Sequence, residues 1–312
     1  MKIIAITPKQ EIKNKELIEK LERLGAIFYE NDVVDLLEVN ELFDEEDKLL
    51  AIDDIRIDGG QVSLNKILPK TKNIKYICSL SSRHHGIELK LLKILNITYC
   101  NNPDTTSESV AQLGIMMMFM LIRKQPLTLK NSFDFYGVNS LGRECQQLSV
   151  GVLGYGNIES KIARICDALS MSVQIWSRSK KKSKFKQVEL EELLSNEIIF
   201  MALPDCEETR ALFTDNLYKS LHPDQYIVDI TANDNLHDKN RLIKMVNNRQ
   251  LLGFGFEAQA PSSRYIKQTG NIVMTPHIGW ATEEGYFRMY KGWVDTILSY
   301  LEGKPVNEVC VS

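Results

Sequence analysis

Short apolar runs alternate with longer amphipathic stretches along this chain of 312 residues. In the N-terminal part, three runs have the length and composition of strands: residues 2–6, 74–80 and 97–102. Polar stretches with helical spacing separate them, including residues 13–24 and 87–95. Such an alternation is typical of a parallel sheet covered by helices.

A long apolar helix is predicted to begin near Ser107 and Glu108 and to run through the sequence SVAQLGIMMMFMLIRK. Its methionine cluster comprises Met116, Met117, Met118 and Met120. A methionine-rich face can bind partners, but methionine on a helix that is apolar all round more often fills a core. We therefore interpret this segment as a buried helix.

The alternation then restarts with further strand candidates at residues 149–154, 172–176, 197–204, 226–231, 251–258 and 271–279. Helix-length segments separate most of them, which indicates a second, doubly wound sheet of the kind that binds nucleotides. A chain of this length is also expected to form about two domains, since single cores rarely grow beyond about 250 to 300 residues. The predicted fold class is α/β, with two doubly wound, Rossmann-like parallel-sheet domains.

Composition narrows the classes of function. Hydrophobic residues make up 44% of the chain and charged residues 25%, with a net charge of -3, so neither nucleic acid nor a membrane is an expected partner. The N-terminus lacks a signal-peptide pattern, and the longest apolar run, residues 113–122, is shorter than the roughly 20 residues that span a bilayer. The six cysteines stand singly. We expect no metal site, a small-molecule substrate and a cytoplasmic location.

The segment VGVLGYGNIESKIA, residues 150–163, has the context of a dinucleotide-binding turn, because it follows a strand and opens a helix. Gly154 would permit the tight turn, and Gly156 would let the backbone approach a pyrophosphate at the helix start. Glu159 stands where the pattern has its third glycine. We expect Glu159 to push the helix outward or point its side chain away, and to weaken binding by repelling a diphosphate.

Ser177 and Arg178 follow the next strand, where an NAD-binding protein carries an acid for the ribose hydroxyls. An acid there would repel a 2′-phosphate, whereas serine and arginine would bind it. The pair therefore favours NADP(H) over NAD(H). The basic run at residues 178–186 is interpreted as a solvated loop, because aromatic residues do not alternate with its basic ones as in a nucleic-acid-binding site.

Several longer blocks resemble, in order and spacing, the D-isomer-specific 2-hydroxyacid dehydrogenase family. They are GRECQQLSVGVLGYGNIESKIA (142–163), MALPDCEETRALFTDNLYKSLHPDQYIVDITANDNLHD (201–238), LLGFGFEAQAP (251–261), VMTPHIGWATEE (273–284) and, at the interdomain helix, YCNNPDTTSESVAQLGIMMM (99–118). The resemblance implies a flavodoxin-like substrate domain of residues 1–98 and 285–312 and a dinucleotide-binding domain of residues 99–284. It also implies an NAD(P)-dependent oxidoreductase, which we expect to be a homodimer.

In this family a hydride passes between the nicotinamide and the 2-carbon of a 2-oxo acid, while a histidine, a glutamate and an arginine assist. The resemblance puts His277, in TPHIGW, at the acid/base position. Asn233 stands at the arginine position and Ala260 at the glutamate position. A lost charge-assisted bond of about 1.5 to 3 kcal/mol predicts a roughly ten- to hundredfold weaker hold on an anionic substrate. Without that glutamate, we expect His277 to lose the carboxylate partner that would fix its orientation, unless another group substitutes.

The family's substrate-binding turn is glycine-rich, whereas its counterpart here is SSRHHGIEL, residues 81–89. The substrate-binding candidates are Ser81, Ser82, Arg83 and His84. Arg83, with His84 or His85, would replace the cation that Asn233 lacks, although a solvated polar turn is the alternative. The cofactor-binding candidates are Gly154, Gly156, Asn157, Ile158, Ser177, Arg178, Leu203, Pro204, Thr231, Ala232, Glu257, His277 and Gly279.

Three functions remain open at this point. The first is an NAD(P)-dependent oxidoreductase that reduces an atypical 2-oxo compound, or oxidises the 2-hydroxy compound, with His277 as acid/base. The second is a protein that uses bound nucleotide without net hydride transfer to a free substrate. The third is a catalytically impaired family member that acts as a nucleotide-binding or regulatory protein, in which Glu159, Asn233 and Ala260 would mark relaxed constraint.

Overall fold

The computed structural model describes residues 1–82, 86–131, 141–231, 236–259 and 264–309. Contacts divide the chain into two compact units, which we call the first unit (Met1–Thr106 with Glu283–Ser312) and the second unit (Ser107–Thr282). The boundaries expected from the sequence, 98/99 and 284/285, differ slightly from these. Strand β5 (Thr98–Cys100) hydrogen-bonds to a strand of the first unit, which places the divide after it.

The first unit is built on a five-stranded sheet with the order β2-β1-β3-β4-β5, the flavodoxin-like order that the resemblance implied. Its strands are β1 (Lys2–Ile6), β2 (Ile27–Tyr29), β3 (Lys48–Ile52), β4 (Ile74–Ser79) and β5. Its α-helices are α1 (Lys9–Ile12), α2 (Lys15–Arg23), α3 (Gly60–Ile67), α4 (Leu89–Ile94) and α12 (Glu283–Leu301). Short 3-10 turns lie at Leu36–Glu38, Asn40–Phe43, Asp54–Arg56 and Leu68–Lys70.

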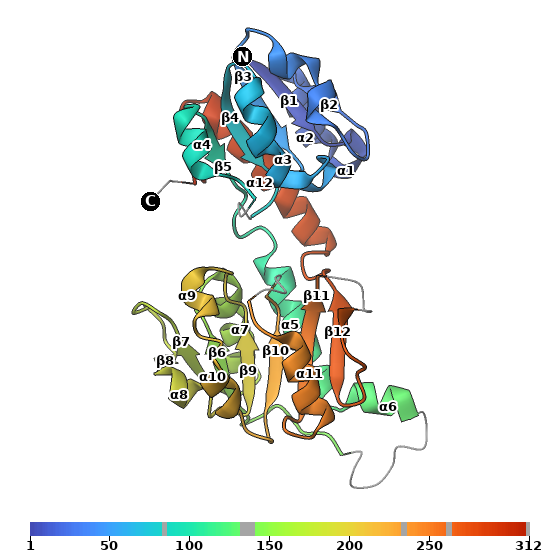
Figure 1. Ribbon diagram of the computed structural model, residues 1–312, viewed down its shortest axis with the longest axis vertical. Coiled ribbons are helices and arrows are strands. Elements are labelled where there is room, and N and C mark those ends of the chain that lie inside the picture. Colours follow the sequence, from blue (N-terminus) through green and yellow to red (C-terminus); the bar gives the residue numbers. More distant parts are fainter. Residues whose placement is uncertain (83–85, 132–140, 232–235, 260–263, 310–312) are drawn as a thin grey trace. The chain divides into compact units, whose positions relative to one another are not determined.

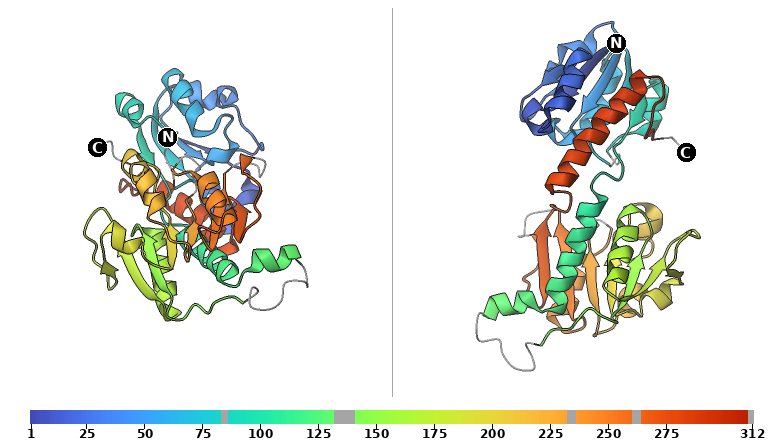
Figure 2. Two further views of the ribbon diagram at one scale, coloured as in Figure 1. Left: turned by 60° about the horizontal axis from the view of Figure 1, so that its bottom comes forward. Right: turned by 180° about the vertical axis from the view of Figure 1, so that it is seen from behind.

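Helix α12 returns the end of the chain to the first unit and completes its core (Figure 2). Trp293 is fully buried, and its indole N–H donates to the carbonyl of Cys78 at 3.0 Å. On the same helix, the Tyr290 hydroxyl lies 3.2 Å from the Thr7 hydroxyl. Two large aromatic side chains therefore join the C-terminal helix to β4 and to the end of β1.

The second unit has a seven-stranded sheet with the order β12-β11-β10-β9-β6-β7-β8. Its strands are β6 (Ser149–Leu153), β7 (Ser172–Trp176), β8 (Lys186–Gln187), β9 (Ile198–Met201), β10 (Tyr226–Asp229), β11 (Gly253–Ala258) and β12 (Ile272–Pro276). All neighbouring strands are parallel. The predicted fold class, two doubly wound parallel-sheet domains, is confirmed.

Helices cover both faces of this second sheet (Figures 1 and 2). They are α5 (Ser107–Ile122), α6 (Gln125–Asn131), α7 (Asn157–Ala168), α8 (Leu190–Leu193), α9 (Glu207–Arg210), α10 (Asp215–Lys219) and α11 (Lys239–Asn247). Helices α5 and α7 bury one set of alternating strand residues, and α10 and α11 bury the other. Met117 and Met118 lie fully inside this core as predicted, whereas Met116 is exposed.

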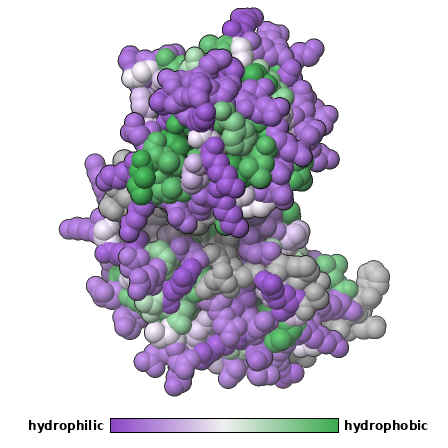
Figure 3. Space-filling view, turned by 45° about the horizontal axis from the view of Figure 1, so that its top comes forward, coloured by the Kyte–Doolittle hydropathy of each residue, from purple (hydrophilic) through white to green (hydrophobic). Residues whose placement is uncertain are grey.

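Charged and polar residues cover most of the face shown in Figure 3, as the composition predicts. Within the described ranges, no helix combines the length and the apolar character needed to cross a membrane.

Candidate active site

The predicted cofactor residues of the second unit lie at or just after the carboxyl ends of its strands. Those that the structure describes are Gly154, Gly156, Asn157 and Ile158 after β6, Ser177 and Arg178 after β7, Leu203 and Pro204 after β9, Thr231 after β10, Glu257 as the penultimate residue of β11, and His277 and Gly279 after β12. Because the strands are parallel, these ends share one edge of the sheet (Figure 1). The strand order reverses at β6, and doubly wound folds bind ligands outside such a switch point.

The turn between β6 and α7 has two features of a dinucleotide-binding turn, a glycine with positive φ and an exposed helix start. Gly154 has a φ of 107°, which strongly favours glycine, and its N–H donates to the carbonyl of Trp176 at 2.9 Å. Gly156 and Asn157 are exposed at the start of α7, a helix of 12 residues. The residues present therefore fit a pyrophosphate at the positive end of this helix.

The Glu159 side chain folds back into the turn, which rules out one of the two expected alternatives, that it points away. Its carboxylate Oε2 accepts the Gly156 N–H at 3.1 Å, and the residue is 6% exposed. A Cβ at Gly154 would lie only 2.5 Å from the other oxygen, Oε1. Burial raises the pKa of Glu159, although hydrogen bonds from the backbone and the charge of Lys181 oppose the rise. The third glycine position is therefore filled by a carboxyl group that caps the helix from inside.

Arg178 lies on the surface after β7. Its guanidinium is 3.6 Å from the Glu208 carboxylate and 3.9 Å from the Cys206 sulfur, and both charged side chains are more than half exposed. Such a surface pair is worth at most about 1 kcal/mol, so it does not prevent the arginine from binding another anion. The carbonyl of Ser177 accepts the Gln187 amide at 3.0 Å, which ties this corner to β8.

Thr231 is turned inward rather than toward the surface. Its backbone N–H donates to Asp229 Oδ1 at 2.8 Å, and its hydroxyl bonds the same oxygen. Leu203 is also buried, whereas Pro204 is exposed. The backbone N–H and the hydroxyl of Thr231 are therefore both already hydrogen-bonded to Asp229.

His277 has a carboxylate neighbour that the sequence comparison did not predict. Its Nδ1 lies 3.6 Å from Glu257 Oε1, and the two side chains are 36% and 1% exposed. Glu257 is held by two backbone donors, Ile278 N–H at 2.9 Å and Gly279 N–H at 2.7 Å. The indole N–H of Trp280 donates to the His277 carbonyl at 3.2 Å. Glu257 is therefore a carboxylate that lies near His277 without a hydrogen bond to its Nδ1, and it is the group that could substitute for the missing partner.

The expected substrate turn belongs to the first unit and is described in part. Ser81 and Ser82 follow β4, and their carbonyls accept the Asn102 N–H at 2.9 Å and the Asn101 side-chain amide at 2.8 Å. Beside them, the Ser79 hydroxyl donates to Asp54 at 2.7 Å. Burial raises the pKa of Asp54 to about 6. The candidates Arg83, His84, His85, Ala232, Asn233 and Ala260 lie outside the described residues.

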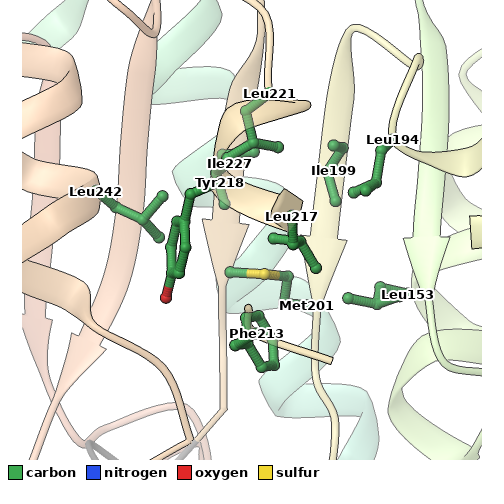
Figure 4. A pocket seen from close by; sticks show the side chains of 10 residues that line it. All are labelled: Leu153, Leu194, Ile199, Met201, Phe213, Leu217, Tyr218, Leu221, Ile227 and Leu242. Atoms are coloured by element: carbon green, nitrogen blue, oxygen red, sulfur yellow. The ribbon is translucent and has the colours of Figure 1, made fainter. Parts of the chain in front are cut away.

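An apolar pocket lies on one face of the second sheet, under α10 and α11 (Figure 4). Its lining consists of Leu153, Leu194, Ile199, Met201, Phe213, Leu217, Tyr218, Leu221, Ile227 and Leu242. None of these residues is a predicted site residue, and the lining is almost wholly hydrocarbon. This pocket is a packing feature of the core and not the candidate site.

The family model of the D-isomer specific 2-hydroxyacid dehydrogenase NAD-binding domain matches residues 115–279, more than half of the 312 residues. The chain belongs to this family. It is therefore a D-2-hydroxyacid dehydrogenase-type oxidoreductase with a nicotinamide-nucleotide-binding domain.

Known relatives agree with this assignment. A putative 2-hydroxyacid dehydrogenase of Staphylococcus aureus is 23% identical, over 92% of this chain and 98% of its own. A 4-methyl-2-oxopentanoate reductase of Aspergillus oryzae is 25% identical, over 70% of this chain and 68% of its own. Among solved structures, an acyclic imino acid reductase in complex with NADPH and D-Arg has a TM-score of 0.80 at 22% identity, covering 99% of this chain and 100% of that one. The last likeness supports the fold.

Proposed function

We propose that this protein is an NADP(H)-dependent oxidoreductase that reduces an atypical 2-oxo compound, or oxidises the corresponding 2-hydroxy compound, with His277 as acid/base. The proximity of His277 and Glu257 carries the proposal. The two side chains lie 3.6 Å apart, at the same edge of the sheet as the glycine turn. A bound nicotinamide nucleotide would supply or accept the hydride. His277 would give or take the hydroxyl proton.

The surroundings of His277 suit proton transfer. Glu257 faces Nδ1, so it would select the tautomer that carries its proton there and leave Nε2 for the substrate. The 3.6 Å separation is longer than a hydrogen bond, and catalytic contacts of this kind often tighten when substrate binds. With 36% of its side chain exposed, the imidazole is accessible to a ligand.

Two considerations support an atypical substrate. Asn233 replaces the arginine that would form a bidentate pair with a carboxylate, which disfavours small, strongly anionic 2-oxo acids. One similar protein is a 4-methyl-2-oxopentanoate reductase, and another is an acyclic imino acid reductase in complex with D-Arg. Both 4-methyl-2-oxopentanoate and D-Arg are larger than pyruvate. We propose a larger or less acidic 2-oxo compound as the substrate.

The proposed preference for NADP(H) rests on Arg178. The Arg178 side chain is 52% exposed after β7, and Ser177 stands where a ribose-binding acid would repel the 2′-phosphate. Its pairing with Glu208 is weak enough to exchange for a phosphate.

Equilibrium titration with NADPH and NADH, followed by nucleotide fluorescence, tests the cofactor part. We expect NADPH to bind more tightly, and Arg178→Ala to narrow the difference by about tenfold, the value of one charge-assisted contact. Arg164→Ala is the matched control, since Arg164 is an exposed arginine of the same unit paired with Glu108 at 3.1 Å. Equal affinities, or tighter binding of NADH, would contradict this part of the proposal.

NADPH oxidation with a panel of 2-oxo compounds tests the chemical part. Pyruvate and glyoxylate should be reduced very poorly, while a bulkier compound is turned over and His277→Ala abolishes that turnover. Brisk reduction of glyoxylate would overturn our interpretation of Asn233. Nucleotide binding without turnover across the panel would favour the catalytically impaired alternative.

The homodimer and the cytoplasmic location expected from the sequence belong to the same proposal. Light scattering at micromolar concentration measures the first, and fractionation of the source cells measures the second.

A further inference from the structure

Lys239 is a charged residue in a position that normally excludes one. It is the first residue of α11 and is 3% exposed. A positive charge at a helix N-terminus opposes the helix dipole, and a buried ammonium group is costly unless it is paired. The position is therefore stable only because specific partners compensate for both effects.

The partners of Lys239 come from two neighbouring strands. Its Nζ donates to the carbonyl of Glu257 on β11 at 2.8 Å and lies 3.5 Å from Asp229 Oδ2 at the end of β10. It also lies 5.6 Å from the centre of the Phe256 ring, within the range of a cation–π contact. The ammonium group thus links the ends of β10 and β11 to the start of α11.

Asp229 is the anionic anchor of this arrangement. It is fully buried, and it accepts hydrogen bonds from Thr231 and pairs with His237 Nε2 at 2.9 Å. Burial by itself would raise the pKa of Asp229, but His237, Lys239 and Thr231 together hold it below its ordinary value. Asp229 is therefore a carboxylate at neutral pH, and it offers Lys239 a full negative charge.

The same segment of β11 carries the carboxylate beside His277. We propose that Lys239, anchored by Asp229, is a positioning residue: by holding the Glu257 carbonyl, it keeps the Glu257 carboxylate on the Ile278 and Gly279 amides and next to the imidazole. This link is structural and stands without any substrate. Its consequence for turnover rests on the proposed function of His277.

Amide hydrogen exchange, resolved by NMR, tests the link directly. In Lys239→Met, which keeps the length of the side chain without its charge, we expect the Ile278 and Gly279 amides to exchange at least tenfold faster than in the wild type. Lys239→Arg keeps the charge and should restore most of the protection.

Gln225→Met is the matched control in the same unit. Gln225 is 2% exposed, and its amide donates to the carbonyl of Asn196 at 2.8 Å, at the opposite end of the sheet. The Gln225→Met variant removes a buried donor without changing a side chain of β11, so the Ile278 and Gly279 amides should stay protected. Equal acceleration in both variants, or none in Lys239→Met, would overturn the proposal.

If Lys239→Met does not fold, Asp229→Asn is tested in its place. This variant should speed the exchange of the Ile278 and Gly279 amides, because Lys239 loses the carboxylate that anchors it. A second readout is the turnover of whichever 2-oxo compound the wild type reduces. Lys239→Met should lower kcat at least tenfold with KM and the NADPH Kd within about threefold. A wild type that reduces nothing defeats the proposed function but not the amide result, so the two failures are distinguishable.

Discussion

Replacing Glu159 with glutamine isolates the effect of a carboxylate inside a dinucleotide-binding turn. Glutamine keeps the shape of the side chain and an oxygen that can accept the Gly156 N–H, a contact of 3.1 Å in the wild type. It removes only the negative charge. We expect Glu159→Gln to bind NADPH more tightly than the wild type.

The magnitude follows from the geometry of the turn. A phosphate oxygen held by the neighbouring amides would lie about 6 Å from the Glu159 carboxylate, given ordinary peptide and hydrogen-bond dimensions. At that distance two unit charges repel by about 0.7 kcal/mol in bulk water and about 3 kcal/mol at an effective dielectric constant of roughly 20. The Kd for NADPH should therefore fall by a factor of about 3 to 100. Glycine at this position would also lose the internal cap, so it is a less specific test.

The effect should depend on pH. Burial already raises the pKa of Glu159 above its ordinary value of 4.5, and a bound phosphate would raise it further because the neutral form is then favoured. Binding therefore takes up a proton, and the affinity of the wild type should increase as pH falls toward this pKa. Lys181 is the cation that opposes the shift. Glu159→Gln should lack this component of the pH dependence.

Fluorescence titrations of NADPH between pH 6 and 9 at low salt measure both effects. Glu197→Gln is the control, because Glu197 also accepts a backbone N–H, from Ser149 at 2.9 Å, but at the opposite end of β6. It should leave the Kd unchanged. If Glu159→Gln matches the wild type at every pH, the buried carboxylate does not interact with the nucleotide and the reasoning fails.

Two further predictions concern other buried carboxyl groups. Glu257→Gln should lower kcat at least tenfold, measured as NADPH oxidation, because it removes the carboxylate that faces His277 Nδ1 at 3.6 Å. Asp54 has a pKa raised from 3.8 to about 6, so its folded form binds a proton more tightly than the unfolded chain, and stability is lost as pH rises from about 4 to 6. Asp54→Asn should remove about 3 kcal/mol of that loss in the free energy of unfolding, measured by urea unfolding at pH 4 and pH 7. An unchanged difference between the two pH values would refute the raised pKa of Asp54.

Most strands with an apolar pattern could be predicted from the sequence, but the buried apolar strand β3 (Lys48–Ile52) and the short β2 (Ile27–Tyr29) are not among the predicted runs. The run SVQIW predicts β7 with its observed bounds, Ser172–Trp176. By contrast, β8 (Lys186–Gln187) has only two residues and lies at the end of a basic run. It exists because Gln174 and Ile175 of β7 pair with it, and no local property of Lys186 indicates that partner.

The site shows the same division between local and long-range information. Strand ends can be predicted locally, so Gly154 and His277 could be placed at the edge of the sheet. The carboxylate partner could not, because it depends on the register of β11 against β12. That register pairs Glu257 with Thr275, which brings its side chain next to His277. Comparison along the sequence pointed to Ala260 instead, since it considers position relative to Pro261 and not the neighbouring strand.

In the described part of the second unit, buried charged side chains gather at the edge of the sheet where the candidate site lies. Asp229, Lys239, Glu257 and Glu159 are each at most 6% exposed, although charged groups are seldom buried in a core. Two charged residues of the first unit are buried as well: Lys48 mainly bonds carbonyls, including that of Lys72 at 2.9 Å, and Asp53 lies 3.7 Å from Arg56. At the edge, by contrast, three of the charged residues form a chain of contacts: Asp229 lies 3.5 Å from Lys239, Lys239 donates to the Glu257 carbonyl, and the Glu257 carboxylate faces His277. Since paired buried charges add little net stability over apolar residues, folding alone does not explain this arrangement, whereas the positioning role proposed for Lys239 does.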